Sequence, residues 1–186
     1  MVVEGCLHLK EAGVVHCDLK PENILYTNNK RNEVKIIDLG SACSDLKTEK
    51  PFEYVCSRYY RAPEIVLTRA KYSFPVDMWS IGCIIAELFT GTPIFPASSA
   101  HELIELQSLI AGGFPDHLIH KYDFTKHYFR PSEEEEGVYN LIPCPKNKSQ
   151  SYKQKCKSSI VKEVMKFKLQ ALHGIKSEEL LQMSDP

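Results

Sequence analysis

The sequence has no excess of charge of either sign, no long apolar run and no Cys-x-x-Cys pair, and each absence argues against a class of function. Its 186 residues carry a formal net charge of −1, so composition gives no reason to expect nucleic acid or a membrane as a partner. The longest apolar run, 81–89, is broken by Glu87 and is too short to cross a bilayer. With 43% hydrophobic and 25% charged residues, the chain can form one ordinary globular core.

The cysteines indicate a reducing compartment. There are seven, an odd number, and they are scattered along the chain, which is untypical of a zinc site or a disulfide framework. The sequence also shows no secretory leader at Met1. We therefore expect an intracellular protein of the cytoplasm or nucleus; the pattern predicts no particular oligomeric state.

Against this plain background, three short polar motifs stand out. They are, in chain order, His16-Cys17-Asp18-Leu19-Lys20-Pro21-Glu22-Asn23, then Asp38-Leu39-Gly40, then Ala62-Pro63-Glu64. Phosphoryl transfer needs a base near the acceptor hydroxyl, a cation for the developing charge, and metal ligands for the nucleotide phosphates. Asp18 can be the base, Lys20 the cation, and Asn23 with Asp38 the magnesium ligands.

The chain between the first two motifs predicts a β-hairpin. Two β-rich runs, Ile24–Tyr26 and Val34–Ile37, flank the turn-forming segment 28–32. Such a hairpin would bring Asn23, at the start of one strand, beside Asp38, at the end of the next. Val14–Val15 predicts a further short strand, which follows a helix that ends at Gly13.

The three motifs resemble the catalytic loop, the D-F-G segment and the A-P-E segment of eukaryotic protein kinases. The resemblance extends from Met1 to about Lys121 and implies ATP and Mg²⁺ as cofactors and protein hydroxyls as acceptors. It also implies that Ser57 braces Asp18 and Lys20, that Lys20 contacts the nucleotide phosphate, that Leu25 forms the adenine floor, and that Asp77 anchors the catalytic loop. From the residues alone, Leu25 could equally be a core leucine, and Asp77 a charge at the start of a helix.

Two departures from the common kinase pattern narrow the resemblance. Cys17 stands where most kinases have arginine, and Leu39 stands where phenylalanine is usual. His-Cys-Asp resembles the dual-specificity tyrosine-regulated kinases and their homeodomain-interacting relatives. The segment 57–61 fits the broader group that includes cyclin-dependent, mitogen-activated and glycogen synthase kinases.

Tyr54 aligns with the activation tyrosine of that group. A phosphate there would add nearly two negative charges, and guanidinium groups bind phosphate bidentately. Because Cys17 cannot supply the usual arginine, we expect Arg58 and Arg61 to anchor the phosphate. The alternative is an unmodified packing tyrosine, with both arginines paired to acidic residues.

The predicted fold class is α+β, resembling a kinase C-terminal lobe that is mainly helical with short β-hairpins and lacks the N-terminal lobe. Apolar residues on most faces of the run from Asp77 to Phe89 predict a buried central helix ended by Gly91. A capping box, Ser99 with Glu102, predicts the start of the next helix. We predict a partial kinase domain over residues 1–130 and a divergent, partly disordered tail over 131–186.

Several kinase parts are missing from the sequence. No Gly-x-Gly-x-x-Gly loop precedes His16, and no arginine follows Arg130 to pair with Glu64. We therefore expect a fragment that binds ATP poorly. The leading hypothesis is a serine/threonine kinase, with dual specificity left open, and the alternative is a catalytically impaired interaction module. A small-molecule phosphotransferase is disfavoured, because the segment ending in Ala62-Pro63-Glu64 serves peptide substrates.

Overall fold

A computed structural model describes residues 1–27, 33–44, 56–68, 73–120 and 123–143 of the chain. Residues Met1–Cys144 form one compact unit. The predicted domain boundary at residue 130 stays a prediction, although the described structure continues to residue 143. The predicted partial disorder of the tail concerns mainly residues 144–186, which lie outside the described part.

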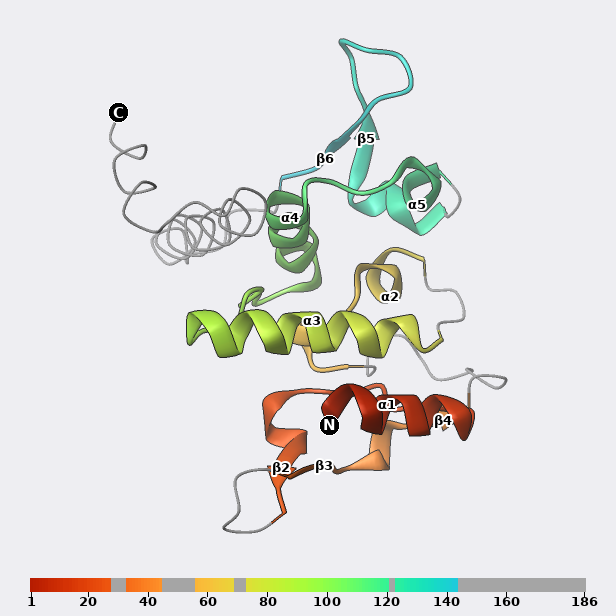
Figure 1. Cartoon of the computed structure of the whole chain (residues 1–186). Coiled ribbons are helices and arrows are strands. Elements are labelled where there is room, and N and C mark those ends of the chain that lie inside the picture. Colours follow the sequence, from red (N-terminus) through yellow and green to blue (C-terminus); the bar gives the residue numbers. More distant parts are fainter. Residues whose placement is uncertain (28–32, 45–55, 69–72, 121–122, 144–186) are drawn as a thin grey trace, which may run out of the picture. The chain divides into compact units, whose positions relative to one another are not determined.

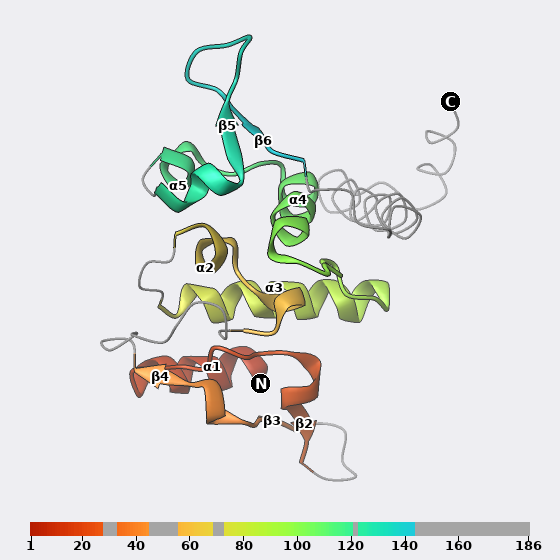
Figure 2. The same ribbon diagram turned by 180° about the vertical axis from the view of Figure 1, so that it is seen from behind.

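The described unit combines helices with three two-stranded antiparallel sheets (Figures 1 and 2). The helices are α1 (Val2–Glu11), α2 (Pro63–Leu67), α3 (Pro75–Thr90), α4 (Ala100–Ala111) and α5 (Asp116–His120). The strand pairs are β1 (Val14–Val15) with β4 (Cys43–Ser44), β2 (Ile24–Tyr26) with β3 (Val34–Ile36), and β5 (Phe129–Pro131) with β6 (Tyr139–Leu141). Short 3₁₀ turns are η1 (Pro21–Asn23), η2 (Leu39–Ser41), η4 (Arg58–Tyr60) and η5 (Asp123–His127). The predicted combination of helices with short strand pairs is confirmed, and its assignment to a kinase C-terminal lobe stays a prediction.

The longest helix, α3, runs through the middle of this unit. In both ribbon views α1 and strands β1–β4 lie on one side of it, and α2, α4, α5 and the β5–β6 hairpin lie on the other (Figures 1 and 2). Pro75 starts the helix, where its missing N–H costs nothing. Gly91 ends it with a φ of 75°, a left-handed conformation that favours glycine. The predicted end of α3 is therefore confirmed.

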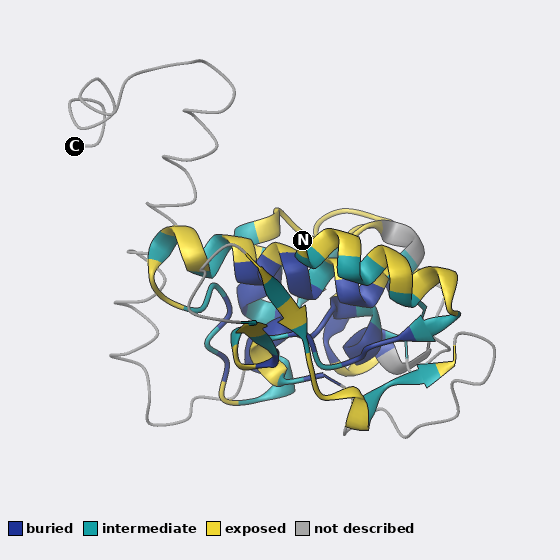
Figure 3. Cartoon of the chain, turned by 60° about the horizontal axis from the view of Figure 1, so that its bottom comes forward, coloured by how far each residue is buried: buried dark blue, intermediate teal, exposed yellow. Residues whose placement is uncertain are grey.

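The main core lies between α3 and the helices packed above it in Figure 1, and Figure 3 shows in dark blue the buried residues of the chain, which gather in its interior. Ile81 and Ile84 of α3 are about as buried as Leu103 and Leu106 of α4. Val66 and Leu67 of α2 are fully buried and complete this cluster.

One face of α3 departs from the prediction. Met78, Ile85, Leu88 and Phe89 are exposed, and Leu88 retains 78% of its accessible surface. The prediction that α3 is buried on most sides is therefore wrong for this face. The sequence shows which residues of the helix are apolar, but it does not predict which neighbouring segment, if any, covers each of them.

The start of α4 follows the predicted cap with one change. The Ser99 hydroxyl accepts a 3.1 Å hydrogen bond from the Glu102 amide, as in a capping box. The Glu102 carboxylate, however, accepts a 2.9 Å bond from the amide of Ser98 rather than from that of Ser99. The helix starts where predicted, and its reciprocal bond shifts by one residue.

Candidate active site

The first turn of α3 holds the loop that carries the first motif. The Asp77 carboxylate accepts hydrogen bonds from the backbone amides of His16 (2.7 Å) and Cys17 (2.9 Å). Asp77 is only 4% exposed, and this burial raises the pKa of its carboxyl, although the two amide hydrogen bonds oppose the rise. The predicted anchoring contact of Asp77 is confirmed.

His16 connects this loop to the β2–β3 hairpin. Its Nδ1 accepts a 3.2 Å hydrogen bond from the Asp18 amide, so its Nε2 carries the proton and donates to the carbonyl of Ile37 at 3.0 Å. The side chain is fully buried. Sequence reasoning gave His16 no role of its own; a histidine directly before the motif's cysteine and aspartate was the available signal.

Asp18, Lys20 and Ser57 form a closed triangle of hydrogen bonds. Lys20 Nζ donates to Asp18 Oδ2 at 2.8 Å and to Ser57 Oγ at 3.2 Å. The hydroxyl and the amide of Ser57 both donate to Asp18 Oδ1, at 2.8 and 2.9 Å. The structure therefore brings the three predicted catalytic residues together, although Ser57 lies 39 positions after Asp18.

This triangle keeps Asp18 ionised. Burial alone raises the pKa of Asp18, but the hydrogen bonds from Lys20 and Ser57 and the charge of Lys20 outweigh it, so the pKa lies below its usual value. The hydrogen bond to Asp18 raises the pKa of Lys20, and partial burial lowers it by less, so the pKa of Lys20 lies above its usual value. An ionised carboxylate beside an ammonium group can orient an acceptor hydroxyl and leave a positive charge close by.

The β2–β3 hairpin brings the two predicted metal ligands, which are far apart in the sequence, to the same end of two paired strands. The predicted pairing is confirmed, with Ile24 opposite Ile36, and the Ile37 amide donates to the Asn23 carbonyl at 2.9 Å. Asn23 and Asp38 therefore lie at the same end of the hairpin. The predicted turn residues 28–32 lie outside the described part.

The donor atoms at this end of the hairpin suit Mg²⁺. Asn23 Nδ2 donates to the Asp18 carbonyl at 2.9 Å, which fixes the amide and leaves its oxygen without a hydrogen bond among the described residues. Asp38 is exposed, and its Oδ1 accepts a hydrogen bond from the Gly40 amide at 3.2 Å. Mg²⁺ prefers such oxygen ligands and completes its shell with water and phosphate oxygens. No described group of three His, Cys, Asp or Glu side chains offers a more enclosed metal site.

Leu25 is open to solvent. It retains 48% of its accessible surface, so the alternative of a core leucine does not hold in the described structure. An exposed leucine one position beyond Ile24 can contact a flat apolar ring. Its role in nucleotide binding stays a prediction.

The two predicted phosphate anchors differ in their surroundings. Arg58 is exposed, and its Nη1 donates to the Ser98 carbonyl at 2.9 Å. Arg61 is 9% exposed and donates through Nε and Nη2 to the Cys56 carbonyl at 3.3 and 2.8 Å. Tyr54 lies outside the described residues, so the phosphate-binding role of both arginines stays a prediction.

Backbone strain concentrates in this region. Among the described residues, the non-glycine positions with positive φ are Cys17 (65°), Asp38 (66°) and Cys56 (61°). A left-handed conformation at a residue with a side chain costs on the order of 1 kcal/mol, and such strain gathers at functional sites. All three belong to, or directly adjoin, the loops that form the triangle and the metal-ligand pair.

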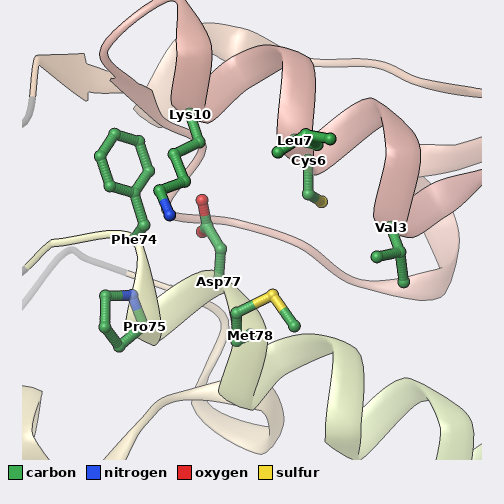
Figure 4. Close-up of a pocket in the computed structure, with 8 residues that line it drawn as sticks. All are labelled: Val3, Cys6, Leu7, Lys10, Phe74, Pro75, Asp77 and Met78. Carbon is green, nitrogen blue, oxygen red and sulfur yellow. The ribbon is translucent and has the colours of Figure 1, made fainter.

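A separate hollow of about 340 Å³ lies between α1 and the start of α3. Its apolar lining includes Val3, Leu7 and Met78, and Lys10 and Asp77 supply polar groups (Figure 4). Asp18 and the metal-ligand pair do not line it. The hollow therefore lies behind the catalytic loop and shares only Asp77 with its support.

No helix among the described residues is long and apolar enough to span a membrane. Curated relatives of the chain are protein kinases. It is 45% identical over 131 residues to the dual specificity protein kinase YAK1 homolog of Arabidopsis thaliana, a match that covers 69% of this chain and 13% of that protein. It is 51% identical over 100 residues to the dual specificity protein kinase YAK1 of Saccharomyces cerevisiae, covering 54% and 12%.

A human relative is dual specificity tyrosine-phosphorylation-regulated kinase 3, 43% identical over 115 residues, covering 62% of this chain and 19% of that protein. The chain thus spans less than a fifth of the length of these three relatives. The family described as the protein kinase domain matches residues 1–177. This match covers most of the chain and agrees with the geometry of the catalytic loop, so the chain belongs to the protein kinase family.

Proposed function

We propose that this chain is the substrate-side lobe of a protein kinase that transfers the γ-phosphate of ATP to serine or threonine hydroxyls of proteins. The closed triangle of Asp18, Lys20 and Ser57 carries the proposal, because it places an ionised carboxylate beside a fixed cation. Lysine at position 20 favours serine/threonine acceptors. The names of the Arabidopsis thaliana and Saccharomyces cerevisiae relatives, both dual specificity protein kinases, support dual specificity.

In this proposal the residues act by position and charge. Asp18 orients the acceptor hydroxyl and takes its proton, and Lys20 neutralises the charge on the phosphoryl group in transfer. Ser57 holds both side chains in place through its hydroxyl and amide. Asn23 and Asp38 would hold Mg²⁺, which supplies positive charge to the nucleotide phosphates.

Tyr54 supplies a proposed switch. Its phosphate would pair with Arg58, which is exposed, and with Arg61, whose Nη1 has no hydrogen bond among the described residues. The name of the human relative, a tyrosine-phosphorylation-regulated kinase, supports this role. The change Tyr54→Phe in the longest natural form of the protein should lower kinase activity, and unchanged activity would count against the switch.

The 186 residues contain no glycine-rich loop, and we propose that they lack the parts that grip the α- and β-phosphates. Nucleotide affinity of this chain alone should therefore be low. The alternative function, an interaction module without turnover, keeps the same lobe and needs no nucleotide.

A binding and transfer experiment separates the two functions. The purified chain would be titrated with Mg²⁺-ATP by NMR and assayed for transfer of radiolabelled phosphate to a mixture of protein substrates. Shifts at Asn23 and Asp38 that vanish in Asp38→Ala, with any transfer abolished by Asp18→Asn, would support the kinase. Neither shifts nor transfer at millimolar nucleotide would favour the interaction module.

A further inference from the structure

A buried glutamine of α4 holds the backbone of the segment that carries Ser57. Gln107 is fully buried, and its Nε2 donates a 2.8 Å hydrogen bond to the carbonyl of Arg61. Because the acceptor is a carbonyl, the side-chain amide has to face it with its NH₂ group, which fixes the orientation of the side chain. Gln107 therefore joins α4 to a residue 46 positions earlier in the chain.

The oxygen of the same side chain is left without a partner. Gln107 Oε1 is buried and has no hydrogen bond among the described residues. A buried acceptor without a partner destabilises a fold, and an apolar side chain of similar shape avoids that cost. Packing alone therefore does not favour glutamine at this position, which directs attention to its bond with Arg61.

Arg61 extends this restraint to the residue before Ser57. Its guanidinium group donates through Nε and Nη2 to the Cys56 carbonyl, at 3.3 and 2.8 Å. Arg61 is 9% exposed, so its side chain has little room to leave this position. The turn η4 closes the same segment, because the Tyr60 amide donates to the Ser57 carbonyl at 2.9 Å. Gln107 thus restrains the end of a segment that starts at Cys56.

One planar peptide group joins this restraint to the candidate active site. The carbonyl of Cys56 and the amide N–H of Ser57 belong to the same peptide unit, so they rotate together. Arg61 holds the carbonyl, and the Ser57 amide donates to Asp18 Oδ1 at 2.9 Å. Cys56 has a φ of 61°, a value that neighbouring contacts have to maintain in a residue with a side chain. Rotation of this group would weaken the bond to Asp18.

We propose that Gln107 is a positioning residue for phosphoryl transfer: it holds Arg61, which in turn orients the peptide group between Cys56 and Ser57 toward Asp18. The catalytic consequence rests on the proposed kinase function, whereas the effect on the Ser57 amide does not. Because Gln107 acts through Arg61, its loss should disturb the orientation of Asp18 rather than the binding of nucleotide.

Hydrogen exchange measured by NMR tests this role in the whole chain. The change Gln107→Met substitutes an unbranched apolar side chain and removes the donor to Arg61. The Ser57 amide should then exchange on the order of tenfold faster relative to the Ile84 amide, which lies in the core of α3 and reports global opening. An unchanged ratio of the two rates would overturn the proposal, because Gln107 would then only support the fold.

Thr125→Val provides the matched control. Thr125 is 2% exposed, and its hydroxyl donates to the Ile119 carbonyl, outside the segment 56–61. Loss of this buried bond should leave the ratio of the Ser57 and Ile84 exchange rates as in the native chain. A change in the control as large as that in Gln107→Met would overturn the proposal. If Gln107→Met does not fold, Gln107→Asn, whose amide is one methylene shorter, should raise the same ratio, and an unchanged ratio there would also overturn it.

Steady-state kinetics separate the positioning role from the proposed function. In the longest natural form of the protein, Gln107→Met should lower kcat about tenfold and leave the KM for ATP within about twofold of the native value. A raised KM for ATP with an unchanged kcat would overturn the positioning role. If the native protein transfers no phosphate, the proposed function fails, whereas the exchange ratio still decides whether Gln107 orients Ser57.

Discussion

The backbone amide of Cys17 donates a 2.9 Å hydrogen bond to the carboxylate of Asp77, a residue 60 positions later. The second oxygen of the same carboxylate accepts from the His16 amide. One buried side chain on α3 therefore holds the two residues that precede Asp18. The position of the proposed catalytic base depends on a helix that the chain forms much later.

Replacing Asp77 tests that dependence. The change Asp77→Asn keeps one oxygen but turns an amide NH₂ toward a backbone N–H, so one buried donor loses its acceptor. We expect a loss of about 1–3 kcal/mol in the free energy of unfolding. Hydrogen exchange at the His16 and Cys17 amides should also accelerate. Urea unfolding and exchange NMR measure the two effects.

The matched control for this change is Asp38→Asn. It is the same chemical change at an exposed residue. Asp38 has a left-handed backbone conformation, and asparagine tolerates that conformation. Its effect on stability should stay within about 0.5 kcal/mol. Equal losses in both variants would argue that Asp77 has no special anchoring role.

The Ser57 hydroxyl should lower the pKa of Asp18. In Ser57→Ala, Asp18 keeps its bonds from Lys20 and from the residue 57 amide but loses the 2.8 Å bond from the hydroxyl. Because that bond stabilises the ionised carboxylate, the pKa of Asp18 should rise. NMR titration of the Asp18 carboxyl carbon would show the change. Ser44→Ala, at an exposed serine outside the triangle, should leave the titration unaltered.

Glu64 should make stability depend on pH. Burial raises the pKa of its carboxyl, and no ion pair to Glu64 is present in the described part of the chain. In the pH range between the unfolded and the folded pKa the folded state binds more protons. The contribution of Glu64 to stability is therefore lost as the pH rises through this range. Glutamine does not titrate, so the Glu64→Gln variant should be more stable than the native chain at neutral pH.

Measurements at acidic pH test whether the Glu64 carboxylate causes this difference in stability. At a pH below the ordinary glutamate value both side chains are uncharged, so the advantage of Glu64→Gln should shrink. Glu134→Gln, at an exposed residue of the β5–β6 loop, should show no such pH-dependent gain. A variant at position 64 that is destabilised at every pH would indicate that the carboxylate has a partner. Thermal unfolding at several pH values between acidic and neutral measures the stability of the native chain and of both variants.

The local parts of the site were predictable, and the long-range contacts only in part. Two β-rich runs, Ile24–Tyr26 and Val34–Ile37, flank a turn-forming segment and so predict a hairpin, and the hairpin alone places Asn23 near Asp38. The bonds from Ser57 to Asp18 and from Asp77 to Cys17 follow from the family resemblance, because no local pattern reports them. The contact between Cys17 and Cys43 was not predicted, since scattered cysteines carry no spacing signal.

The exposed face of α3 shows where sequence periodicity fails. Apolar residues on most faces predict burial, yet Leu88 is 78% exposed whereas Ile84, four residues earlier, is 6% exposed. Both side chains lose methyl groups when changed to alanine. Ile84→Ala should cost about 2–5 kcal/mol because it leaves a cavity in a packed core.

Leu88→Ala removes little buried surface, and alanine favours the helix, so its effect should stay within about 0.5 kcal/mol. Urea denaturation of the two variants provides the measurement. If Leu88→Ala lost as much stability as Ile84→Ala, this face of α3 would be covered in solution, and the original prediction of a buried central helix would be restored.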